Sequence, residues 1–228
     1  MGARQPITTA PQIVEANSKG YMVVFGTGKF MEPSDSTTAQ AQSIYGVWDS
    51  IESTATNFTV PRTKLFPRTA TLSGTAVSLT TTTFTFGMGI GEYRGWRIDL
   101  PETRERIAAE SALGTGAVIF NAAIPEGTCS GDGRGRPYCV NPVRGTSVCG
   151  APSSEDGIPG PPIVIQVELQ ASSYTKRTPT GRRTVTLEQR SINSTTKITD
   201  AGNTLIGGRA LESVSIPAGR LNWRELRQ

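Results

Sequence analysis

Histidine is absent from this chain of 228 residues. Its absence excludes a Ser-His-Asp triad and a histidine general base, and it removes a common zinc ligand. Cysteine is scarce, because Cys129, Cys139 and Cys149 are the three in the chain, each ten residues from the next. They form no Cys-x-x-Cys pair, so a metal site or a thioredoxin-like redox centre is not expected.

Long hydrophobic runs are also missing. No stretch of about 18 apolar residues occurs, so no membrane span is predicted. Residues 1–6 contain no apolar segment of the kind that a secretory signal requires. Because the loops look typical of an exported protein, we expect the chain to be a fragment of something longer.

Charge is modest and uneven. The net charge is +4, and residues 172–228 carry 10 basic and 4 acidic side chains, so the positive charge lies near the end of the chain. A solvated surface is the simplest interpretation, and an acidic binding partner is the alternative. Nucleic acid is not expected as a partner, because the basic residues are not interleaved with base-stacking aromatic residues.

Glycine (25 residues) and proline (15 residues) are abundant, and hydrophobic residues make up 36%. This composition favours an all-β protein with many turns. Apolar runs and apolar–polar alternation predict strands, of which the first two form a hairpin. Residues 22–25 are a continuous apolar run, so we expect this second strand to be packed on both faces. The predicted strands cover residues 12–16, 21–25, 44–49, 81–86, 94–101, 105–110, 117–124, 163–169 and 211–216.

Two glycine-rich segments invite a nucleotide-binding interpretation, which their spacing does not support. Residues 26–29 read Gly-Thr-Gly-Lys. A phosphate-binding loop needs glycine where Val23 stands, and it needs serine or threonine where Phe30 stands. Residues 87–91 lack both nucleotide fingerprints, and no helix clearly follows them. Structural turns are the better interpretation of both segments.

All three cysteines fall in residues 126–162, which we predict to be a long irregular insertion. Clustered cysteines in an exposed loop suit an oxidising compartment, where two would pair and the third would be left over. The disulfide candidates are Cys129 and Cys149, and which two of the three pair is open. Exposed, covalently fixed loops commonly bind partners, so this insertion is a candidate for function, and a surface insertion with a structural staple is the alternative.

Several motifs occur in the order found in PilY-type proteins, the type IV pilus assembly and tip-adhesin family. The longest are Val-Val-Phe-Gly-Thr-Gly-Lys-Phe (23–30) and Gln-Ser-Ile-Tyr-Gly-Val-Trp-Asp (42–49). The others are residues 6–11, 94–96, 99–101, 105–106, 118–120, 124–125 and 222–225, with Asp35 and Cys129. The chain resembles the C-terminal part of that family. The signature positions, to which we assign structural roles, are Gly26, Gly28, Lys29, Tyr45, Trp48, Asp49, Gly95, Trp96 and Asp99.

The resemblance implies the C-terminal blades of one β-propeller domain over residues 1–228, with the loop insertion at 126–162 and a poorly patterned basic segment at 170–208. It also implies export to the cell surface, the pilus, or the periplasm and outer membrane. The implied partners are pilus subunits, pilus-assembly proteins and a host-surface receptor. The family's calcium loop would lie upstream of Pro6, and Asp132 lacks the alternating carboxylates of such a loop, so we expect no cofactor or metal in this chain.

The predicted function is therefore non-enzymatic: pilus biogenesis and surface adhesion. The alternatives are a quinoprotein-dehydrogenase-like propeller and a carbohydrate-binding propeller. The enzyme needs a tryptophan that stacks on a quinone, a metal site and a carboxylate base, and we cannot assemble that set. Core packing is the expected role of Trp48, Trp96 and Trp223, and turn capping that of Asp49 and Asp99.

Overall fold

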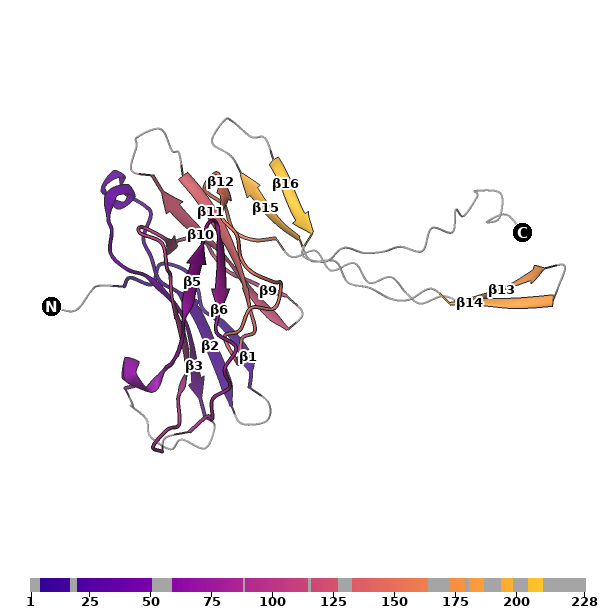
Figure 1. Ribbon diagram of the computed structural model, residues 1–228, viewed down its shortest axis with the longest axis horizontal. Helices are drawn as coiled ribbons and strands as arrows, with labels where there is room; N and C mark the ends of the chain where they lie inside the picture. Colours follow the sequence, from indigo (N-terminus) through magenta and orange to yellow (C-terminus); the bar gives the residue numbers. More distant parts are fainter. Residues whose placement is uncertain are drawn as a thin grey trace.

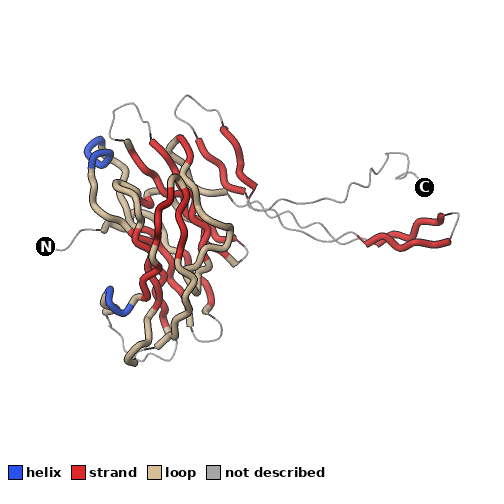
Figure 2. Tube along the Cα trace, in the orientation of Figure 1, coloured by secondary structure: helices blue, strands red, loops and turns tan. Residues whose placement is uncertain are grey.

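The chain forms mainly antiparallel β-sheets, and the two larger sheets share one core (Figure 1). The computed structural model describes residues 5–16, 20–50, 59–87, 89–114, 116–126 and 133–163, and the backbone of four strands between 173 and 210. Within these residues there is no α-helix, and the two short helical turns are 3₁₀: η1 (Pro33–Thr37) and η2 (Arg62–Lys64). Figure 2 shows how strands and loops dominate, and the predicted all-β class is confirmed.

The first sheet has five strands in the order β1-β2-β3-β7-β4. They are β1 (Gln12–Glu15), β2 (Tyr21–Gly26), β3 (Ser43–Asp49), β7 (Gly95–Asp99) and β4 (Phe66–Arg68). The predicted hairpin is present, with Ile13 opposite Val23, and β3 then pairs with β2 as expected. β4 runs parallel to β7, and the other neighbours are antiparallel.

The prediction that the apolar run at residues 22–25 of β2 is packed on both faces is wrong. Met22 and Val24 are fully buried, whereas Tyr21 is exposed and Val23 and Phe25 are half-buried. One face of the sheet lies on the core and the other is partly open to solvent, which an antiparallel sheet allows.

The second sheet has the order β12-β11-β10-β8, with β9 also paired to β10. Its strands are β8 (Arg106–Ile107), β9 (Ala112–Gly114), β10 (Ala117–Pro125), β11 (Gly133–Val140) and β12 (Glu155–Asp156). Every residue of β10 is buried, as its apolar sequence predicts. The strand predicted over residues 105–110 is reduced to the two residues of β8.

β11 corrects the prediction of an irregular insertion over residues 126–162. This eight-residue strand pairs with β10 along its whole length, with Ile119 opposite Cys139. Its sequence, Gly-Arg-Gly-Arg-Pro-Tyr-Cys-Val, looks like a loop because it carries glycine, proline and two arginines. The alternation that defines the strand depends on a buried arginine, Arg136, which lies inside with Tyr138 and Val140.

The segment between β4 and β7 also departs from the prediction. The strands here are β5 (Ala70–Ser73) and β6 (Ala76–Leu79), which pair antiparallel. Residues 81–86, predicted as a strand, lie outside any strand, and only Phe86 forms an isolated bridge, to Tyr93. The predicted shared face of Phe84 and Phe86 is present, since their rings pack with centroids 4.8 Å apart.

Two further antiparallel pairs lie in the segment at 170–208 and just beyond it. They are β13 (Ser173–Thr178) with β14 (Gly181–Thr186), and β15 (Ser194–Ile198) with β16 (Leu205–Ala210). The strand predicted over 211–216, most of that predicted over 163–169, and Trp223 lie outside the described residues.

Candidate functional site

The Gly-Thr-Gly turn of the first signature motif is a packing element. A side chain at Gly26 would overlap Ile107 of β8, and Gly28, with φ of 149°, lies against Arg106. The amide of Ile107 donates to the carbonyl of Thr27 over 2.9 Å. These glycines therefore let the end of β2 approach the second sheet, in keeping with the prediction of a structural turn.

Lys29 and Asp35 organise the turn that follows. The ammonium of Lys29 lies 3.0 Å from the carboxylate of Glu32 and 3.8 Å from that of Asp35. Asp35 accepts hydrogen bonds from the amides of Met31 and Glu32, which lower its pKa. The guanidinium of Arg106 donates to the carbonyls of Lys29 and Asp35, so this turn is fastened to β8.

Replacing Asp35 with asparagine is expected to make the free energy of unfolding fall less steeply as the pH is lowered. The folded pKa of Asp35 is lowered from its ordinary value of 3.8, so its contribution is present above that pH and is lost as the pH falls through the lowered folded pKa. Asparagine keeps a hydrogen-bond acceptor and removes the titration. The measurement is the free energy of unfolding against pH for both proteins, with the exposed Glu110→Gln as control. Parallel curves for the wild type and Asp35→Asn would contradict the expectation.

Tyr45 and Asp99 belong to a polar cluster on the first sheet. Asp99 accepts a hydrogen bond from Ser43 over 2.7 Å and pairs with Arg62 and Arg97. Burial opposes ionisation of Asp99, but the hydrogen bonds from Ser43 and Arg62 and the nearby positive charges outweigh it, and the pKa is lowered. These contacts join Asp99 to β3, to η2 and to its own strand β7, which supports a structural role.

Trp96 joins the first sheet to the turn that follows β11. Its ring is fully buried, and side chains at Gly46 or at Gly145 would overlap it. Its indole nitrogen donates to the carbonyl of Pro142 over 2.9 Å. The described part of the chain thus confirms the predicted core role of Trp96, and Trp48 is half-buried against the same core.

A buried charged cluster was missed by the sequence analysis. Arg136 and Glu105 are both fully buried, and the guanidinium contacts the carboxylates of Glu105 at 2.6 Å and Glu102 at 2.7 Å. Tyr138 donates to Glu105 over 2.9 Å. Burial raises the pKa of Glu105 and of Tyr138, while Arg136 offsets part of the effect on Glu105. The sequence did contain a signal for this strand: Arg134, Arg136 and Tyr138 stand at every second position, which places them on one face of a strand.

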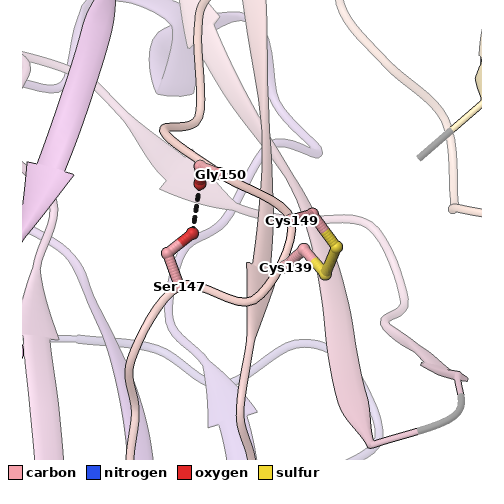
Figure 3. Close-up of a disulfide and its surroundings, with 4 residues drawn as sticks. All are labelled: Cys139, Ser147, Cys149 and Gly150. Atoms are coloured by element: carbon pink, nitrogen blue, oxygen red, sulfur yellow. Dashed lines mark hydrogen bonds between the residues drawn. A yellow bond between two sulfur atoms is a disulfide. The ribbon is translucent and has the colours of Figure 1, made fainter. Parts of the chain in front are cut away.

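The disulfide joins Cys139 to Cys149, which corrects the pairing of Cys129 with Cys149 (Figure 3). Cys139 is buried in β11 and Cys149 is exposed in the following turn. The amide of Val148 donates to the carbonyl of Cys139 over 2.9 Å, and the hydroxyl of Ser147 donates to the carbonyl of Gly150. Cys129 and Asp132 lie outside the described residues. The prediction that the cysteines lie in an exposed loop is wrong for Cys139, which is buried in a strand.

Thiol titration of the denatured, non-reduced chain is expected to find one free thiol. The chain has three cysteines, two of which form the disulfide, so Cys129 is the third. Cys129→Ser should lower the count to zero, and Cys149→Ser should raise it to two. Three free thiols in the unreduced wild type would contradict the pairing.

A cavity of about 250 Å³ opens beside this turn. It is lined by Ala16, Trp48, Arg68, Phe84, Phe86, Val143 and Arg144. Arg68 is buried, and its guanidinium donates to the carbonyl of Arg144 over 2.9 Å and to that of Thr80 over 3.2 Å. The cavity therefore combines aromatic and cationic side chains from segments that are far apart in the sequence.

Among the described residues, no group of three or more aspartate, glutamate, cysteine or histidine residues is arranged to hold a metal ion. The same residues contain no helix that is long and apolar enough to cross a membrane.

Comparison with known sequences identifies one family. Residues 1–81 match a family model described as the PilY1 β-propeller domain. A 51-residue segment is 51% identical to the type IV pilus biogenesis factor PilY1 of Pseudomonas aeruginosa strain PAO1, covering 21% of this chain and 4% of that protein. A 157-residue segment is 26% identical to the PilY1 homolog of Xylella fastidiosa, covering 65% of this chain and 10% of that protein.

Comparison with solved structures gives the same result for the fold. The crystal structure of the Pseudomonas aeruginosa PilY1 C-terminal domain superposes with a TM-score of 0.55 at 20% identity, covering 81% of this chain and 44% of that chain. The predicted resemblance and the propeller fold are confirmed. The matched part spans less than half of the solved domain and a tenth or less of the two curated relatives above.

Proposed function

We propose that this chain, which belongs to the PilY1 family of type IV pilus biogenesis factors, is the C-terminal portion of one propeller domain that acts without catalysis in pilus biogenesis and surface adhesion. Its partners would be pilus subunits, pilus-assembly proteins and a host-surface receptor. Its location would be outside the cytoplasm, on the pilus, the cell surface, or in the periplasm and outer membrane. The Cys139–Cys149 disulfide supports an oxidising location.

The observation that carries the proposal is the turn between β11 and β12. The disulfide, the hydrogen bond from Trp96 to Pro142 and the hydrogen bond from Arg68 to Arg144 hold this turn in place. Val148, next to Cys149, is half-exposed although it is apolar. A fixed loop that presents an apolar side chain suits the binding of a protein partner, because little ordering entropy is lost on association.

The first test is deletion of the full gene. Pilus number, twitching motility and surface adhesion are expected to fall. If all three stayed at the wild-type level, the proposal would be lost. A quinone absorbance in the purified protein would instead support the dehydrogenase-like alternative.

A second test separates the turn from the scaffold. Val148→Asp should reduce adhesion or piliation without lowering the amount of folded protein, since its side chain is 50% exposed. Leu72→Asp on β5 is the matched control, because Leu72 is 40% exposed and lies away from the turn in sequence. Equal effects of the two substitutions would contradict a specific role for the turn.

A further inference from the structure

The cavity beside Val143 and Arg144 contains two positive charges, and none of the acidic residues that the structure describes forms an ion pair with them. Arg68 is only 2% exposed, and among the described residues neither Arg68 nor Arg144 forms an ion pair. Burial and the charge of Arg144 lower the pKa of Arg68. Two neighbouring guanidinium groups in a cavity with apolar walls concentrate a positive potential there.

The backbone satisfies part of the hydrogen-bonding capacity of Arg68, but it supplies no opposite charge. Its guanidinium donates to the carbonyls of Arg144, Thr80 and Thr82. Carbonyl dipoles hold the group in position, and a carboxylate would add a charge-assisted hydrogen bond, which is stronger than one between neutral groups. Arg144 lines the same cavity and is exposed, so both guanidinium groups face the space that a ligand would occupy.

The aromatic rings leave little open face for a stacked ligand. Arg94 lies over the Trp48 ring at 5.3 Å from its centroid, and Phe86 packs on Trp48 with centroids 5.5 Å apart. Phe84 stacks on Phe66 at 4.9 Å and also has Arg68 over it at 5.4 Å. Ring edges carry positive partial charge, so they favour an anion, whereas a sugar ring would need a free face.

We propose that this cavity binds a carboxylate on a short aliphatic stem, namely a glutamate or aspartate side chain of a partner polypeptide. The carboxylate would bind Arg68 and Arg144, and the stem would contact Phe86 and Val143. The volume of about 250 Å³ is below the roughly 300–1,000 Å³ of sites for drug-sized ligands, so it suits a single side chain. The inference rests on the geometry of the cavity and stands independently of a role in pilus biogenesis.

The test is a binding titration of the 228-residue chain with a blocked glutamate, N-acetyl-glutamate methylamide. Chemical shifts of the Trp48 indole N–H and the Arg68 Nε–H report occupancy. Blocked glutamate is expected to shift both signals at low salt, and blocked glutamine, its neutral isostere, is expected to bind at least about tenfold more weakly, as for the loss of one charge-assisted contact.

Arg144→Gln is the variant that separates the proposal from a structural role. It keeps the backbone carbonyl that accepts from Arg68 and removes an exposed charge, so the fold should persist while affinity for blocked glutamate falls about tenfold. Arg62→Gln is the matched control, because Arg62 is also exposed and does not line the cavity. Its affinity should stay within about twofold.

Four results would overturn the proposal. The first is the absence of any shift with blocked glutamate, and the second is equal binding of blocked glutamine. The third is an equal loss of affinity in Arg62→Gln and Arg144→Gln, which would indicate nonspecific attraction. The fourth is tighter binding of another probe: galacturonate would indicate a site for acidic sugars, and inorganic phosphate would indicate a site for any small anion.

Discussion

Glu105→Ala is expected to lower the free energy of unfolding by about 3–5 kcal/mol, because it leaves Arg136 buried with one carboxylate partner removed. Arg136 is fully buried and contacts Glu105 at 2.6 Å and Glu102 at 2.7 Å. The substitution also removes the acceptor of the Tyr138 hydroxyl. Urea unfolding of the wild type and the variant measures the difference.

A double substitution distinguishes the charge effect from a loss of packing. Glu105→Leu with Arg136→Met removes both buried charges and fills the space with apolar groups, so it should recover much of the stability that either single change loses. Glu126→Ala is the control, since its carboxylate is half-exposed and pairs with Arg134 at 3.3 Å; its cost should be within about 1 kcal/mol. Additive losses in the double variant would contradict the assigned coupling.

The sequence predicted the elements whose burial comes from apolar side chains. β2, β3, β7 and β10 have apolar runs or alternation bounded by turn residues, and each is present close to its expected bounds. β11 was missed because its inward face includes Arg136, which is favourable inside only with Glu105, 31 residues earlier in the chain. A pattern of apolar residues cannot show that pairing, because it depends on tertiary contact.

The candidate site was less accessible to sequence reasoning than the fold. The interpretation of the cysteine segment was right about a fixed turn but wrong about Cys129, since the partner of Cys149 is in β11. The cavity draws Trp48, Arg68, Phe86 and Arg144 from four separate segments. No local spacing relates these residues, so their meeting follows from the packing of the two sheets.

Trp96→Ala is expected to lower the free energy of unfolding by about 3–5 kcal/mol, the usual cost of truncating a fully buried large aromatic side chain. The ring fills the space between Gly46 of β3 and Gly145 of the turn after β11. Its loss would leave a cavity between the first sheet and that turn, and would leave the Pro142 carbonyl without its indole donor. Denaturant unfolding gives the size of the loss.

Trp96→Phe separates ring packing from the hydrogen bond. Phenylalanine keeps much of the apolar contact but has no N–H, so its cost should be smaller, with about 1–3 kcal/mol from leaving the Pro142 carbonyl unsatisfied. Trp48→Phe is the control. Because Trp48 is only half-buried, this substitution should lower the free energy of unfolding less than Trp96→Phe does. Equal losses in the free energy of unfolding for Trp96→Phe and Trp48→Phe would contradict a stabilising role for the hydrogen bond from Trp96 to Pro142. A larger loss at Trp96, with faster reduction of Cys139–Cys149, would show that this ring holds the disulfide-bearing turn against the sheet.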